Sequence, residues 1–151
     1  MNNPAQNYLR TKVLTATPEQ LQLMLYDGAI RFAEQARAAL EQKNFDQSFD
    51  LISRTQKIIA EMVASLKHDV APDLCGKLSA LYNFVYRKLV EANVGHELRP
   101  LDEALSILRY QRETWVMLLQ QLGKTKAAAA ASKLDMPAPS ASMEASISMQ
   151  G

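Results

Sequence analysis

The sequence has 151 residues, of which 48% are apolar and 22% charged, and it contains a single cysteine. A chain of this length can bury one hydrophobic core, and its composition is that of a globular protein. Its 17 basic and 16 acidic residues leave a formal net charge of +1, which argues against nucleic acid or an anionic membrane surface as the main partner. The lone cysteine excludes an internal disulfide framework and a multi-cysteine zinc site.

The first sixteen residues are mostly polar, with a few apolar side chains among them. We expect an N-terminal arm over residues 1–16 that is either flexible or lies on the rest of the protein. The segment lacks the basic start and the apolar stretch of a secretory signal. No part of the chain approaches the roughly 20 apolar residues of a membrane span. The sequence therefore predicts a cytoplasmic protein without membrane insertion.

Four long segments with a helical period follow the arm, and Pro, Gly and Asn residues separate them. We expect helices over about residues 18–42, 45–67, 72–93 and 100–122. The first begins with Thr17-Pro18-Glu19-Gln20, a capping box with proline at the first helical position. Asn44 is the expected cap of the second helix, whereas Pro72 and Pro100 open the third and fourth. Gly95 and Gly123 are the expected stops of those two helices.

Apolar residues recur at steps of three and four along these helices, so that each set lies on one face. The second helix carries Phe45, Phe49, Ile52, Gln56, Ile59, Val63 and Leu66 on that face, and the third carries Leu74, Leu78, Leu81, Val85, Leu89 and Ala92. Arg112 interrupts the stripe of the fourth helix and is expected to reach a carboxylate or a helix-end carbonyl. Matched lengths and short connections predict an all-α fold, an antiparallel four-helix bundle over residues 17–123.

Residues 124–151 differ from the bundle in composition, being rich in alanine and serine and free of aromatic residues. The run Ala127–Ala131 favours a continuation of the fourth helix, because alanine has the highest helix propensity. From Met136 to the end we expect disorder.

The sequence offers little support for an enzyme. A di-iron bundle needs Glu-x-x-His motifs, but Ser65 and Asn93 stand three residues before the two histidines, His68 and His96. Cys75 lacks an evident base, so it is interpreted as a structural thiol. We expect no catalytic residue, no metal site and no cofactor. A phosphotransfer domain is the rival four-helix bundle, but it needs a histidine in mid-helix, and both histidines lie at helix ends or in connections.

Several helices carry more apolar surface than one core stripe requires. Leu23, Tyr26 and Ile30 form a second stripe on the first helix, and Tyr82, Tyr86 and Val90 flank the core stripe of the third. Two interpretations remain open. Either these residues close the seams between helices, or they line apolar grooves that receive helices of a partner.

Three motifs give the sequence a family resemblance. Thr15–Ile30 reads TATPEQLQLMLYDGAI, Tyr86–Asn93 reads YRKLVEAN, and Leu108–Trp115 reads LRYQRETW. Together with Tyr8 and Val13 near the start, they occur in the order and at the spacing of the FliS family, the flagellin-specific export chaperones. The sequence resembles this family over about residues 5–122.

The resemblance implies a helical bundle without catalytic activity or cofactor that acts in the cytoplasm. Such chaperones bind the disordered C-terminal segment of flagellin, prevent its premature polymerisation and keep it competent for the flagellar type III export apparatus. The alternative is a signalling bundle, either a phosphotransfer domain or a module that binds a regulator, and weak homodimerisation is also left open.

The expected partner-binding residues fall into two groups. By resemblance, the arm docks over an apolar groove of the free bundle and moves aside for the client. Its residues are Tyr8, Val13 and Leu14. The groove candidates on the helices are Leu23, Tyr26, Ile30, Tyr82, Tyr86 and Val90. Asn93 and Asp27 are candidates for hydrogen bonds to the client at the rim, with capping or solvent exposure as the alternatives.

Overall fold

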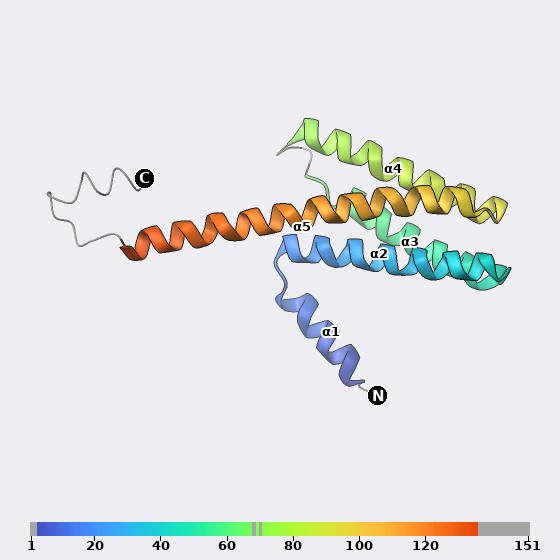
Figure 1. The fold of residues 1–151 in the computed structure, drawn as a ribbon, viewed down its shortest axis with the longest axis horizontal. Helices are drawn as coiled ribbons and strands as arrows, with labels where there is room; N and C mark the ends of the chain where they lie inside the picture. Colours follow the sequence, from blue (N-terminus) through green and yellow to red (C-terminus); the bar gives the residue numbers. More distant parts are fainter. Residues whose placement is uncertain (1–2, 68, 70, 136–151) are drawn as a thin grey trace, which may run out of the picture. The chain divides into compact units, whose positions relative to one another are not determined.

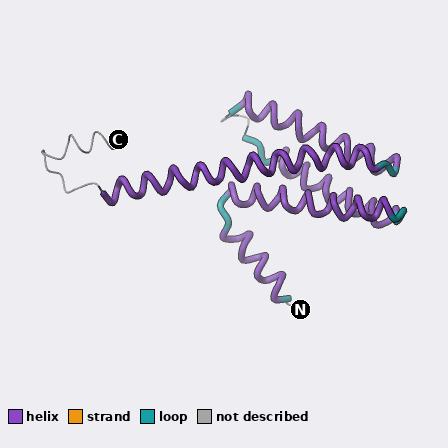
Figure 2. Tube along the Cα trace, in the orientation of Figure 1, coloured by secondary structure: helices purple, strands orange, loops and turns teal. Residues whose placement is uncertain are grey.

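The computed structural model describes residues 3–67, 69 and 71–135, and its regular structure is helical (Figures 1 and 2). The helices are α1 (Pro4–Thr15), α2 (Pro18–Glu41), α3 (Phe45–Ala64), α4 (Pro72–Gly95) and α5 (Leu98–Asp135). Contacts divide the chain into two compact units, Met1–Thr114 and Trp115–Gly151. The first contains α1 to α4 and the beginning of α5, and the second contains the remainder of α5.

The predicted antiparallel four-helix bundle is confirmed. Successive helices of the first unit from α2 onward run in opposite directions (Figure 1), and α3 packs against both α2 and α4. Ion pairs set the register between α2 and α5, because Asp27 pairs with Arg112 and Arg37 pairs with Asp102. The residue number on α5 falls as the number on α2 rises, as two antiparallel helices require.

The starts of α2 and α3 form as the local sequence predicts. The Thr17 hydroxyl accepts a hydrogen bond from the backbone N–H of Gln20 (3.1 Å), whose side chain accepts one from the Thr17 N–H (3.0 Å). This reciprocal pair satisfies two backbone donors that the first turn of α2 would otherwise leave unpaired. The Asn44 side chain caps α3 by accepting from the Gln47 N–H (3.3 Å).

Two helices end at other residues than the sequence predicts. Helix α3 ends at Ala64 rather than near residue 67, because the next residue, Ser65, bonds to the Met62 carbonyl through its hydroxyl. Helix α4 includes Gly95 instead of stopping before it. The left-handed cap falls on His96, at φ 54°.

Two helical segments go beyond the expected boundaries. Residues 4–15, expected to be part of an arm, form helix α1 with Asn3 as its cap and Pro4 in its first turn; the same cap-then-proline signal marked α2. Helix α5 begins at Leu98 rather than Pro100 and continues through Gly123 to Asp135, which agrees with the expected extension through the alanine run. The expected disorder from Met136 onward lies outside the described residues.

The core of the bundle combines a row of alanines on α2 with large side chains from all four helices. Ala29, Ala33 and Ala36 are fully buried on α2, which lets neighbouring helices approach closely. The large buried side chains of the other helices include Ile52, Ile59, Met62, Val85, Leu89, Leu101, Leu105 and Leu108. The expected core positions Phe45 and Phe49 of α3 are instead exposed, as is Leu74 of α4.

Two polar residues occupy inward positions of α3. Ser48 and Thr55 are buried, and each hydroxyl bonds to a carbonyl of its own helix, that of Phe45 (3.1 Å) and that of Leu51 (2.9 Å) respectively. A hydroxyl satisfied within its own helix can enter a core at low cost. The core face of α3 is therefore rotated away from its aromatic residues.

Gln111 of α5 is a polar residue without such compensation. It is 7% exposed, and both its side-chain nitrogen and its side-chain oxygen are buried without a hydrogen-bond partner among the described residues. Leaving buried polar groups unpaired costs about 1–3 kcal/mol.

Gln111→Leu is therefore expected to raise the free energy of unfolding by about that amount, measured by urea denaturation. Gln35→Leu, at an exposed site on α2, is the matched control and should change it little. A lower stability for Gln111→Leu would contradict this reading of the core.

Candidate partner-binding surface

Exposed apolar side chains stand on both α3 and α4, two helices that pack against each other. On α3 they are Phe45 and Phe49, the latter 62% exposed; on α4 they are Tyr86 and Val90, each 39% exposed. We call these four residues the α3–α4 patch. The Phe45 ring packs edge-on against the His96 ring, with centroids 4.1 Å apart, and this contact sets the register of the two antiparallel helices. One turn further along α3, Phe49 is then level with about Ala92, in the turn of α4 that follows Val90.

The patch combines predicted and unpredicted residues. Tyr86 and Val90 were groove candidates, and the structure leaves both accessible. Phe45 and Phe49 were assigned to the core from their spacing, because the inward orientation of Ser48 and Thr55 has no signature in an apolar pattern. One signal in the sequence could have indicated their exposure. Phe45 and Phe49 are aromatic and stand in the first turns of the helix, whereas its other apolar stripe residues are aliphatic.

Tyr26 and Tyr82 lie in the core instead of on an open surface. Their exposures are 2% and 1%, and their hydroxyls share a hydrogen bond of 2.7 Å, with the Gln22 amide donating to Tyr82 at 3.3 Å. Burial raises the pKa of both phenols above the usual value of 10. In this conformation the two tyrosines form a hydrogen-bonded link between α2 and α4, and direct contact with a partner stays a prediction.

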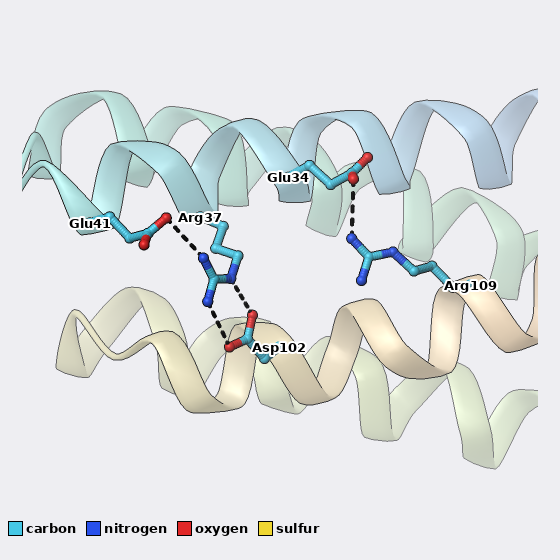
Figure 3. A network of polar contacts seen from close by, with 5 residues as sticks. All are labelled: Glu34, Arg37, Glu41, Asp102 and Arg109. Atoms are coloured by element: carbon cyan, nitrogen blue, oxygen red, sulfur yellow. Dashed lines mark hydrogen bonds and ion pairs between the residues drawn. The ribbon is translucent and has the colours of Figure 1, made fainter.

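The seam between α2 and α5 is closed by charged side chains. Arg37 donates to Asp102 at 2.6 Å and to Glu41 at 2.8 Å, and Arg109 donates to Glu34 at 3.1 Å (Figure 3). The hydrogen bond from Arg112 to Asp27 (2.5 Å) extends the series and identifies the carboxylate that Arg112 was expected to reach.

Two residues that the sequence suggested for client binding, Ile30 and Asp27, lie at this seam between α2 and α5. Ile30 stands between Asp27 and Glu34 in the helical period, on the face that α2 presents to α5, and it is half-buried. Asp27, a rim candidate for the client, pairs with Arg112 at the edge of this seam, where both side chains stay partly exposed. Its contact with a client stays a prediction.

Leu23 belongs to a different surface, between α1 and α2. It lines a pocket of about 320 Å³ together with Lys12, Ala16, Gln20, Met24 and Asp27. No residue of α1 is buried, so Tyr8, Val13 and Leu14 present their side chains to solvent. The docking of these residues over an apolar groove stays a prediction. Asn93 is half-buried on α4, between Val90 and Val94.

The described residues show no sign of a metal centre or of a membrane-spanning element. In ranges 3–67, 69 and 71–135, no three His, Cys, Asp or Glu side chains are grouped so that they could hold a metal ion. No helix in the same ranges has the length and apolar content that a membrane span requires. Of the two histidines weighed for phosphotransfer, His96 caps α4 and packs on Phe45, and His68 lies outside the described residues.

An exposed apolar patch on a helical bundle is typical of a protein that binds other chains. Comparison with known proteins defines the class to which this protein belongs. The sequence is 30% identical over 126 residues to the flagellar secretion chaperone FliS of Bacillus subtilis strain 168, covering 83% of this chain and 93% of that one. It is also 30% identical over 112 residues to the flagellar secretion chaperone FliS of Salmonella typhimurium strain LT2, covering 74% and 83%. These relatives are chaperones, a non-enzymatic class.

The family itself follows from a second comparison. The family described as Flagellar protein FliS matches residues 1–122, and the chain belongs to it. A crystal structure of a flagellar chaperone from bacteria has the same fold, with a TM-score of 0.66 at 18% identity, covering 79% of this chain and 99% of that one. The family match ends at residue 122, as the sequence resemblance does, so that the alanine-rich part of α5 lies beyond it.

Proposed function

We propose that this protein is a cytoplasmic flagellar export chaperone that binds the C-terminal segment of flagellin through the α3–α4 patch. The observation that carries the proposal is the exposure of Phe49, Tyr86 and Val90 in a chain of the FliS family. A soluble protein rarely leaves neighbouring large apolar side chains uncovered unless they bind a partner.

The chemistry of the patch suits a client that folds as it binds. An amphipathic segment that is disordered when free can place successive apolar side chains on such a surface as it becomes helical. Ordering the segment costs several kcal/mol, so the contact has to be long to leave useful affinity. The exposed apolar residues of α1 and the pocket that Leu23 lines are further places where such a client can bind.

The α2–α5 seam is the less suitable surface. Its outer edge is occupied by ion pairs, and a client helix would have to displace charged partners there. We therefore place the client on the α3–α4 side of the bundle. On that side Asn93 follows Val90 along α4, and its side-chain amide can donate or accept a hydrogen bond to the client at the rim of the patch. Docking of the loaded chaperone on the flagellar export apparatus is the second interaction that the family suggests.

The experiment that tests this function is titration of the full-length protein with a peptide of the flagellin C-terminal segment from the same organism. Calorimetry should show saturable binding of one peptide per chain, and circular dichroism at 222 nm should show more helix in the mixture than in the separate components. An equally long peptide from the central part of flagellin is the control. Absence of binding to the C-terminal peptide would refute the proposal.

A further inference from the structure

A second pocket lies where α4 ends and α5 begins, and the function proposed above does not use it. Its volume is about 570 Å³, and Val90, Val94 and Pro100 contribute its apolar lining. Val90 belongs to the α3–α4 patch as well, and Val94 stands one helical turn beyond it, largely exposed. The apolar surface is therefore continuous along α4, from Tyr86 through Val90 to the pocket.

The polar lining of this corner pocket has an excess of carboxylates. Glu91, Glu97 and Glu103 face two cations, Lys88 and Arg99. The Lys88 Nζ atom lies 3.2 Å from a carboxylate oxygen of Glu91 and 3.4 Å from one of Glu103. These contacts raise the pKa of Lys88, and the hydrogen bond to Glu91 has the largest effect. Lys88 is thus held as a cation between two carboxylates.

Glu97 is the third carboxylate of the corner pocket, and it has no cationic partner among the described residues. Among the described residues, no cation lies within ion-pair distance of it, whereas Glu91 and Glu103 are both paired. Its position is defined by the turn, since its N–H bonds to the Ala92 carbonyl (3.2 Å) and its side chain lies against Gly95, where a Cβ would be 2.8 Å from the carboxylate oxygen. A pocket with an apolar part and one unpaired carboxylate matches an apolar side chain with a lysine or arginine next to it.

We infer that the corner pocket binds the continuation of the client segment, at a point where the client carries an apolar residue beside a lysine or arginine. This inference rests on the proposed function and adds to it a chemical requirement on the client. The occupant follows from continuity: a segment lying on Val90 of the patch reaches Val94 within one further turn, and there it meets Glu97. The α3–α4 patch supplies most of the affinity, and the corner pocket selects the end of the segment by charge.

The test compares full-length chaperones that differ at Glu97 in titrations with the flagellin C-terminal peptide. Glu97→Lys should weaken binding about fivefold to tenfold in 50 mM NaCl, and the difference should shrink in 500 mM NaCl because salt screens exposed charges. The affinity of Glu97→Gln for the peptide should lie between those of the parent protein and of Glu97→Lys. Glu61→Lys makes the same change of charge at an exposed position of α3 and should bind as the parent protein does.

A charge exchange identifies the client residue. Each lysine or arginine of the peptide is replaced in turn by glutamate, and one of these peptides should bind Glu97→Lys better than it binds the parent chaperone. If Glu97→Lys binds every peptide as Glu61→Lys does, the corner pocket plays no part and the inference is wrong while the proposed function stands. If the parent protein does not bind the unaltered peptide, the proposed function itself fails, and the inference with it.

Discussion

Replacing Phe49 with glutamate should weaken binding of the flagellin C-terminal peptide at least about a hundredfold and leave the bundle folded. Burying a phenylalanine side chain contributes about 1.5–3 kcal/mol, and a carboxylate in its place would have to lose its water without gaining a partner. Each 1.4 kcal/mol is about tenfold in affinity. The free protein is not expected to suffer, because Phe49 is 62% exposed.

The matched control is Tyr110→Glu, which introduces the same carboxylate at an exposed aromatic position of α5. Calorimetric titration should show parent-like binding for Tyr110→Glu, and the thermal midpoints of both variants should lie close to that of the parent protein. Tyr86→Glu should resemble Phe49→Glu, since both residues belong to the α3–α4 patch. Parent-like affinity for Phe49→Glu would move the client to another surface, and loss of folding would show that Phe49 is needed in the core.

The fold could be predicted from the sequence because its signals are local. Thr17 and Gln20 identify the start of α2, and the step of three and four residues identifies each helix whatever it packs against. Boundaries that depend on competing local signals were less predictable. Gly123 was expected to end α5, but glycine costs an exposed helix only about 1 kcal/mol, and the helix continues into the alanine run.

The candidate surface could be predicted only in part, because an apolar pattern does not say which side of a helix faces the core. Tyr26 and Tyr82 read as a second stripe, yet they are buried because each supplies the other's hydrogen-bond partner across the bundle. Phe49 read as core, yet it is exposed because Ser48 and Thr55 satisfy their hydroxyls within α3. Both outcomes depend on how polar atoms are satisfied in three dimensions, which spacing along the chain does not encode.

The buried tyrosine pair should make the protein lose stability steeply in alkaline solution. Burial raises the pKa of Tyr26 and Tyr82 in the folded state, while in the unfolded chain both phenols lose their protons near pH 10. Above that pH the unfolded state binds fewer protons than the folded state, so the free energy of unfolding falls as pH rises. The stabilisation is complete below about pH 10 and should decline by about 1.4 kcal/mol per pH unit for each tyrosine above it.

The double variant Tyr26→Phe/Tyr82→Phe isolates this contribution. It removes both hydroxyls of one hydrogen bond, so that no buried phenol is left unpaired. Only the half-buried Gln22 amide loses its acceptor on Tyr82, and the cost near pH 7 should therefore be smaller than for removal of one hydroxyl alone. Urea denaturation between pH 8 and 11.5 should show a decline that is shallower than in the parent protein by about 2–3 kcal/mol per pH unit above pH 10. Titrations of other groups are common to both proteins and cancel in the difference.

Two further variants separate the pair from other tyrosine effects. Tyr110→Phe removes an exposed hydroxyl and should leave the alkaline decline as steep as in the parent protein. Tyr82→Phe alone leaves the buried Tyr26 hydroxyl without its partner at 2.7 Å, so it should already be destabilised at pH 7, by about 1–3 kcal/mol. An equally steep decline in the double variant and the parent would mean that these phenols ionise in the folded state as readily as in water, and that the link between α2 and α4 opens before the bundle unfolds.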